Sequence, residues 1–305
     1  MNAATTWEGI FPAAMTMFDK RGQLDEKATL RHFDWLVQEG IQGIVITGTS
    51  GEFIALREGE RRRVIELGIE AVKGRVPVMA GTGYYSTDQT IELTQFAERA
   101  GADGALVILP YYQLPKRQEV KNHYRTIAKN TDLPIFCYNN PMYSGAPELT
   151  PWDLAELYNE GVLRGVKSTS LTAVNQVHTI CLLTDDNFRV FYGSFLAALE
   201  GLAGGAIGWI SGILNIVPSQ AVALWKAINK SKDIERAREL WYSIVPLVNV
   251  YTQQLIGPYS DLSIYRSALN MMGLHGGYSR LPFEPLSEEQ ENKLRPYLEE
   301  ANLIS

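Results

Sequence analysis

Short apolar segments alternate with longer amphipathic segments eight times along most of this chain. Several of the short segments, such as 43–47 and 104–109, are apolar almost throughout, which is typical of strands that are covered on both faces of a parallel sheet. The predicted strands are 10–17, 43–47, 76–81, 104–109, 134–138, 163–167, 188–192 and 206–210.

The segments between these strands carry helix start and stop signals. Asp25, Ser86 and Thr150 each precede an amphipathic stretch, as N-terminal capping residues do, and Pro151 follows at a first-turn position. Glycines follow several of the stretches, as at helix C-termini, namely Gly40, Gly74, Gly101 and Gly161. Eight consecutive strand–helix units predict an α/β protein with a (β/α)₈ barrel, and an open doubly wound sheet is the alternative.

The last third of the chain has a different pattern. From Pro218 onward no strand signal appears, and the helical segments 219–229, 234–255, 262–272 and 287–301 remain. We therefore expect residues 1–218 to supply the barrel strands and most barrel helices. Residues 219–305 would supply the last barrel helix and a C-terminal helical extension within the same structural domain.

Composition narrows the class of protein. The 305 residues are 46% hydrophobic and 20% charged, with a net charge of −6, so we expect a globular protein that binds no nucleic acid. The N-terminal residues show no signal peptide, that is, no basic region followed by an apolar run. No apolar run is long enough to span a membrane, so we expect a cytoplasmic location without membrane association. Cys137 and Cys181 both lie in apolar segments, and we interpret them as core thiols.

Lys167 is the most informative candidate for chemistry, because it ends the apolar segment 163–167. In a barrel, the carboxyl ends of all strands meet at one mouth, where reactive groups gather. Burial disfavours the charged form of an amine, and a neutral amine attacks carbonyl carbon to form a Schiff base. The alternative is a lysine whose ammonium reaches solvent at the strand end.

Other polar residues follow the ends of neighbouring predicted strands. Thr49 and Ser50 lie between two glycines, which allow a concave turn whose amides converge on an anion such as a carboxylate; the alternative is a plain tight turn. Tyr138 and Tyr112 could transfer a proton to a reacting oxygen, or could pack in the core with satisfied hydroxyls.

Several other chemistries lack their sequence signals. The four histidines are far apart and show no metal-ligand spacing, so we expect no metal: His32, His123, His178 and His275. Gly81-Thr82-Gly83 lacks the third glycine of a dinucleotide fingerprint, and no Gly-x-Ser-x-Gly motif of an esterase appears.

Taken together, the strand-end motifs resemble those of the dihydrodipicolinate synthase / N-acetylneuraminate lyase superfamily. They occur in the order and spacing of that family, which implies a barrel with a helical extension, a homotetramer or homodimer, and a class I aldolase that needs no metal or organic cofactor. The matching motifs are Gly48-Thr49-Ser50-Gly51-Glu52, Pro110-Tyr111-Tyr112, Tyr138-Asn139-Asn140-Pro141 with Gly145, and Gly165-Val166-Lys167.

The resemblance also implies a role for each matching residue. Lys167 would form the Schiff base with pyruvate or another 2-keto acid, and Tyr138 would transfer protons beside it. Thr49 would hydrogen-bond the phenol, and Tyr112 would complete the relay, in many members from the neighbouring subunit. The remaining matches would contact the substrate. Thr49 and Ser50 would bind its carboxylate, and Gly193 and the Ile210 carbonyl would line the cavity.

The chain departs from the family pattern where the second substrate binds. Dihydrodipicolinate synthases have an arginine between the proline and glycine of the strand-5 motif, whereas this chain has Tyr143, which offers no cationic fork. Sialate lyases have an acidic pair after strand 7, where this chain has Tyr192-Gly193, although Thr169 resembles the lyase branch.

These features predict a lyase that cleaves or condenses a 2-keto acid through a lysine imine, with pyruvate as the imine-forming component. Two alternatives stay open. One is a dehydratase or deaminase that uses the same imine on a 2-keto-3-deoxy sugar acid or a hydroxylated 2-oxo acid. The other is a non-catalytic binding protein that keeps the barrel alone.

Overall fold

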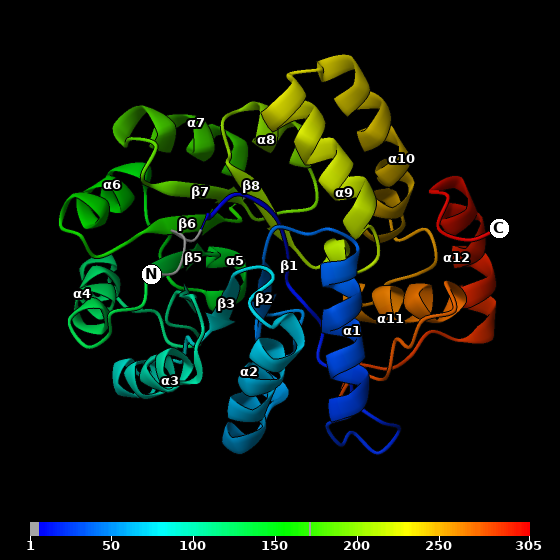
Figure 1. Ribbon diagram of the computed structural model, residues 1–305, viewed down its shortest axis with the longest axis horizontal. Helices are drawn as coiled ribbons and strands as arrows, with labels where there is room; N and C mark the ends of the chain where they lie inside the picture. Colours follow the sequence, from blue (N-terminus) through cyan, green and yellow to red (C-terminus); the bar gives the residue numbers. More distant parts are fainter. Residues whose placement is uncertain (1–5, 171) are drawn as a thin grey trace.

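Eight parallel strands form a nearly closed barrel in the computed structural model, which describes residues 6–170 and 172–305 (Figure 1). Neighbouring strands pair in the order β1-β8-β7-β6-β5-β4-β3-β2, and a parallel bridge between Ala13 and Val45 joins the two ends. The barrel prediction is confirmed, and the open sheet is wrong. The strands are β1 Gly9–Pro12, β2 Ile44–Ile46, β3 Val78–Gly81, β4 Gly104–Ile108, β5 Ile135–Asn139, β6 Gly165–Ser168, β7 Arg189–Tyr192 and β8 Gly208–Ser211.

Helices surround the strands, and those drawn in gold to red gather at one side of the barrel (Figure 1). The helices that lie between or directly after strands are α1 Glu26–Gln38, α2 Glu58–Val72, α3 Thr87–Ala100, α4 Arg117–Ala128, α5 Pro141–Ser144, α6 Pro151–Asn159, α7 Ala173–Leu183, α8 Ala198–Ala203 and α9 Pro218–Trp225. The extension contains α10 Ile234–Thr252, α11 Asp261–Met271 and α12 Glu288–Glu300. The short 3₁₀ helices η1 Phe53–Ala55 and η2 Ile213–Asn215 and the π-helical segment η3 Lys226–Ser231 complete the described elements.

The capping signals at Asp25 and Thr150 act as the sequence predicts, whereas the Ser86 side chain forms no capping hydrogen bond at the start of α3. The Asp25 side chain accepts the Ala28 amide, and Thr150 exchanges hydrogen bonds with Asp153 in a capping box. Gly101 ends α3 in the left-handed conformation with a φ of 100°. These local preferences place each helix boundary and so fix where the loops at the barrel mouth begin.

Hydrophobic side chains fill two layers. One layer lies between strands and helices, and a second cluster fills the barrel interior with aromatic side chains such as Phe11, Phe136 and Phe191. Because the strands are buried on both faces, they read as continuous apolar runs in the sequence. Lys167 is the lysine that β6 carries into this otherwise apolar environment.

The extension is attached to the barrel mouth through one buried and one partly buried ion pair. Arg266 of α11 contacts the Glu52 carboxylate at 2.5 Å and donates to the carbonyls of Thr16 and Gly276. Arg280, after α11, makes two hydrogen bonds of 2.7 Å to Glu60 of α2. Removing one partner of the buried Arg266–Glu52 pair would leave an uncompensated charge, so this pair in particular holds the extension against the loops.

Two details of the sequence interpretation are wrong. The first predicted strand is too long, because β1 ends at Pro12 with only the Ala13 bridge beyond it, and the Thr16 hydroxyl donates to the Gly51 carbonyl of a loop. Cys181 is exposed on α7, whereas Cys137 is buried beside Tyr124. The apolar composition of α7 hid its exposed face. No helix of the described residues is long and apolar enough to cross a membrane.

Candidate active site

Lys167 lies at the third position of β6 with only 5% of its surface exposed. The strand register places it between Tyr138 of β5 and Phe191 of β7. Its ammonium nitrogen Nζ lies 3.9 Å from the centroid of the Tyr138 ring. The lysine therefore ends inside the barrel mouth against a phenol, and the alternative of a lysine whose head reaches solvent is wrong.

Tyr138 is buried and its hydroxyl accepts a hydrogen bond of 2.8 Å from Asn140 Nδ2. Burial by itself raises the pKa of the phenol. The Lys167 charge outweighs this effect, together with the Asn140 hydrogen bond and the nearby polar groups of Thr49 and Lys167, so the pKa of Tyr138 is lowered from its usual value of 10.0. A phenol that gives up its proton more readily suits proton transfer.

Two hydroxyls near the lysine are buried without a partner of standard geometry among the described residues, those of Thr49 and Thr169. Thr49 lies close enough to Tyr138 to help lower its pKa, although it completes no hydrogen bond of ordinary length and angle. A buried hydroxyl without a partner is costly, so such groups in a native site usually await a ligand or water.

The loop before η1 presents free amides. The amides of Gly51, Glu52 and Phe53 donate to backbone carbonyls within the loop, whereas those of Thr49 and Ser50 donate to no group in the described ranges. Ser50 is buried, and Glu52 adopts the left-handed conformation with a φ of 53°. The loop therefore offers two amides and two hydroxyls, a suitable set for a carboxylate.

Gly193 follows β7 and packs directly against the lysine. Its amide donates to the Ser168 carbonyl at 2.7 Å. A Cβ atom at this position would lie 2.5 Å from Thr169 Oγ1 and 2.9 Å from Lys167 Cγ. Only glycine fits here without moving the stem of Lys167.

Replacing Gly193 by alanine should therefore lower kcat/KM, because the new methyl group displaces Lys167 and Thr169. A shift of reacting groups by an ångström costs about 10²-fold in rate. Steady-state kinetics of Gly193→Ala measures the effect. Gly59→Ala is the matched control, since a Cβ at Gly59 in α2 meets nothing within 4 Å. Equal activity of the two variants would contradict the packing argument.

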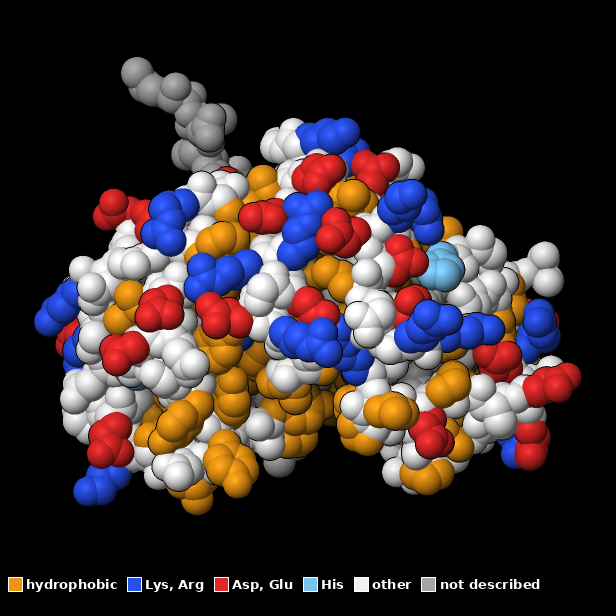
Figure 2. Space-filling model, turned by 90° about the horizontal axis from the view of Figure 1, so that it is seen from below, with side chains coloured by type: hydrophobic (Ala, Val, Ile, Leu, Met, Phe, Trp, Pro, Cys, Tyr) orange, Lys and Arg blue, Asp and Glu red, His pale blue; other side chains and the backbone are white. Residues whose placement is uncertain are grey.

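A cavity of about 790 Å³ opens beside these groups, between the barrel loops and the extension. Its wall shares Thr49, Phe53 and Ile108 with a narrow recess that reaches Tyr138. Figure 2 shows one face of the molecule with apolar side chains gathered around a hollow at its lower edge. The remaining wall residues are Ser50, Glu52, Ile54, Ala55, Tyr111, Tyr143, Tyr251, Ser260, Asp261, Leu262, Arg280, Leu281, Pro282 and Phe283.

Not every predicted residue lies in this arrangement. Tyr112 is 90% exposed with a φ of 80°, and its side chain is outside the cavity of its own chain, whereas Tyr111 lines it. The Ile210 side chain is buried in the barrel interior. Tyr143 lies on the cavity wall, at the start of the segment that follows β5.

Sequence reasoning missed several residues of the site. Asn140 appears in the strand-5 motif, but its contact with Tyr138 required the structure. The pairing of Glu52 with Arg266 joins residues 214 positions apart and leaves no local signal. Asp261 and Tyr251 belong to the extension, and in the sequence Asp261 has the pattern of an ordinary first-turn helix residue.

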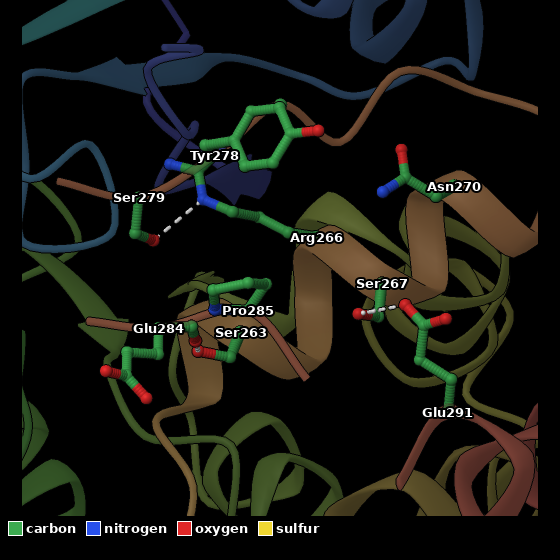
Figure 3. Close-up of a pocket in the computed structure, with 10 residues that line it drawn as sticks. Ser263, Arg266, Ser267, Asn270, Tyr278, Ser279, Glu284, Pro285 and Glu291 are labelled. Atoms are coloured by element: carbon green, nitrogen blue, oxygen red, sulfur yellow. Dashed lines mark hydrogen bonds between the residues drawn. The ribbon is translucent and has the colours of Figure 1, made fainter. Parts of the chain in front are cut away.

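A second, smaller cavity of about 180 Å³ lies within the extension (Figure 3). Arg266 and Ser279 are hydrogen-bonded at its wall, as are Ser267 and Glu291. The guanidinium of Arg266 is engaged by Glu52 on the barrel side. The polar groups of this cavity thus partner one another, and Lys167 is not part of its wall.

Histidines play no visible part in the site. His32 is buried in α1 and contacts Asn215 Oδ1 at 2.8 Å, and burial lowers its pKa to about 4. In the part of the chain that the structure describes, no group of three or more His, Cys, Asp or Glu could hold a metal ion.

Comparison with known proteins gives a consistent result. The model of the dihydrodipicolinate synthetase family matches residues 6–301. A 4-hydroxy-tetrahydrodipicolinate synthase of Methanothrix thermoacetophila is 38% identical over 294 residues, covering 96% of each chain. One of Thermodesulfovibrio yellowstonii is 36% identical and covers 98% of this chain and 99% of its own length. The crystal structure of dihydrodipicolinate synthase from Aquifex aeolicus matches with a TM-score of 0.89 at 31% identity, covering 97% of this chain and 98% of that chain.

Proposed function

This chain belongs to the dihydrodipicolinate synthetase family, whose members are lyase-type class I aldolases, and from that premise we propose that Lys167 forms a Schiff base with pyruvate. The observation that carries the proposal is the position of Lys167, buried at the barrel mouth with its Nζ over the Tyr138 ring. A non-catalytic binding protein would have no use for a buried amine beside a phenol whose pKa is lowered.

The free amides of Thr49 and Ser50 support a position for the pyruvate carboxylate. An anion there would accept hydrogen bonds from both amides and from the unpartnered Thr49 hydroxyl. Fixing the carboxylate holds the keto carbon near Lys167, so that attack by the amine becomes effectively intramolecular.

The reaction then follows from the chemistry of an imine. The neutral amine adds to the keto carbon, and loss of water gives an iminium ion. Removal of a proton from the pyruvate methyl group gives an enamine, which attacks the aldehyde carbon, and hydrolysis returns the free lysine. Tyr138 would transfer the protons, because its hydroxyl lies beside Nζ and its pKa is lowered. We propose that the imine draws electrons sufficiently for the reaction to need no metal or organic cofactor.

The second substrate is not fixed by these groups. The names of the relatives favour synthesis of 4-hydroxy-tetrahydrodipicolinate as one candidate reaction. We infer that Tyr143 takes the place of the arginine of the family pattern, which favours a partner of different charge. A dehydratase or deaminase would use the same imine and would release water or ammonia in place of an aldehyde.

We also propose a homodimer or homotetramer in which Tyr112 reaches the site of a neighbouring subunit. Tyr112 is 90% exposed, and the nearby loops carry the exposed apolar residues Ile54 and Leu114. Apolar side chains of this kind at the rim of a site are typical of a covered surface.

Trapping with borohydride tests the proposed function. Incubation with pyruvate followed by reduction should add one pyruvate-derived group to the protein, and peptide mapping by mass spectrometry should place it on Lys167. An unmodified Lys167 would overturn the proposal. In parallel, turnover of 2-keto-3-deoxy acids should release pyruvate, whereas turnover without pyruvate would favour the dehydratase.

A further inference from the structure

The wall of the large cavity formed by Asp261, Tyr143 and Tyr251 carries polar groups that the proposed reaction does not use. We propose that these three residues form a subsite for the hydroxyl groups of an uncharged, hydroxylated substrate tail. The inference rests on the proposed function, because it assumes that the other end of the substrate is held as an imine on Lys167.

Asp261 presents an acceptor to the cavity. It is the first residue of α11, and its Oδ1 accepts the Leu262 amide at 3.0 Å and contacts the Ser260 hydroxyl at 3.4 Å. Both contacts end on Oδ1, which leaves Oδ2 available to a ligand. Within the described ranges no lysine, arginine or histidine forms a salt bridge with this carboxylate.

The other charged groups of the cavity wall are already paired. Glu52 is neutralised by Arg266, and the guanidinium of Arg280 is held by both oxygens of Glu60. Among the wall residues, Asp261 is therefore the acidic group without a cationic partner, and burial raises the pKa of its carboxyl. An anionic tail would be repelled here, and no free guanidinium is present on this wall to bind it.

Tyr143 and Tyr251 supply donors to the same place. They belong to α5 and α10, which are more than 100 residues apart in the chain, and both line the cavity. Burial and the Asp261 charge raise the pKa of each phenol, so both stay protonated at neutral pH. The subsite thus combines a carboxylate acceptor with two phenolic hydroxyls that both donate and accept.

This combination can engage a substrate hydroxyl through both of its functions. The hydroxyl can donate to Asp261 and accept from a phenol at the same time. The space fits a tail as well. At roughly 30 Å³ for each water-sized group, the six non-hydrogen atoms of pyruvate fill only a small part of the cavity of about 790 Å³.

Aldol addition of pyruvate to matched aldehydes tests the subsite. D-glyceraldehyde carries two hydroxyls, propanal has the same carbon chain without them, and succinic semialdehyde carries an anionic end. We expect the unmodified protein to favour D-glyceraldehyde over propanal in kcat/KM by about tenfold or more, since a site built for hydroxyl groups rejects analogues that lack them. Succinic semialdehyde should be the poorest of the three substrates.

Asp261→Asn removes the charge without changing the shape of the side chain. It should lower kcat/KM for D-glyceraldehyde about tenfold and leave propanal nearly unchanged, while the relative rate with succinic semialdehyde rises. Tyr251→Phe should reduce the preference for D-glyceraldehyde in the same direction. Asp186→Asn, at an exposed aspartate outside the cavity wall, is the matched control and should leave all three rates unchanged.

Borohydride trapping of pyruvate on Lys167 in each protein separates the outcomes. Normal trapping with an altered aldehyde preference in Asp261→Asn supports the subsite. Normal trapping with an unchanged preference overturns the subsite and leaves the proposed function standing. Loss of trapping only in Asp261→Asn would place the residue at the imine end and overturn the subsite. Absence of trapping in the unmodified protein would overturn the proposed function and this inference with it.

Discussion

Replacing Lys167 by methionine should abolish turnover while the protein stays folded. Methionine has a similar length and suits the surrounding apolar barrel interior, so packing is largely kept, but it has no nucleophile. Without the imine, the carbanion formed from pyruvate has no electron sink. We expect kcat/KM to fall on the order of 10³-fold or more, which corresponds to at least about 4 kcal/mol of transition-state stabilisation.

Coupled kinetics with pyruvate and an aldehyde, together with a thermal melt, measures both halves of this expectation. Lys129→Met is the matched control, because Lys129 is exposed at the end of α4 and forms no salt bridge in the described structure. A folded Lys167→Met variant that retained more than about one tenth of the activity would rule out an imine on this lysine. Loss of folding would instead be detected by the melt, and Lys167→Arg then offers a second variant that keeps the charge.

Much of the barrel could be predicted because its strands and helices differ locally in their apolar pattern. Continuous apolar runs marked strands buried on both faces, and capping residues such as Asp25 and Thr150 marked helix starts. Strand ends were less reliable. The run after Pro12 stays apolar, but only its start remains in the sheet: Ala13 and Ala14 donate to carbonyls of β8 and β2, whereas the Met15 amide donates to the Asn215 side chain. Composition alone could not show where the strand ends.

The site was predictable only as far as its groups follow strand ends. Lys167, Tyr138 and Thr49 each occupy such a position, and the barrel brings them together at one mouth. No comparable positional rule in the sequence marks which residues of the extension reach the cavity. Asp261 reaches the cavity because Arg266 and Arg280 attach the extension to Glu52 and Glu60, and pairings over such sequence distances depend on tertiary packing. The resemblance of the strand-end motifs to those of the family therefore indicated the imine chemistry. It gave no sign of the proposed subsite at Asp261.

Replacing Tyr138 by phenylalanine should give the second large effect, by removing the proton-transfer group while keeping the ring against which Lys167 packs. A well-placed general acid–base group contributes typically 10²–10⁴-fold, so we expect kcat to fall by about 10³-fold. Trapping of pyruvate on Lys167 should slow but should still reach the same adduct. This separation distinguishes Tyr138 from Lys167, whose loss removes the adduct itself.

The pH dependence of the reaction gives an independent test of the same role. The pKa of Tyr138 is lowered from 10.0, so its proton is lost as pH rises through a value below that of a free phenol. The plot of rate against pH should therefore contain a sloping limb below pH 10 in the unmodified protein. The same plot for Tyr138→Phe should lack this limb. Asn140→Leu removes the donor at 2.8 Å and should move this limb to higher pH, because the phenolate loses a stabilising hydrogen bond. Tyr242→Phe, at an exposed position of α10, is the control. An unchanged limb in both site variants would assign the titration to another group and contradict proton transfer by Tyr138.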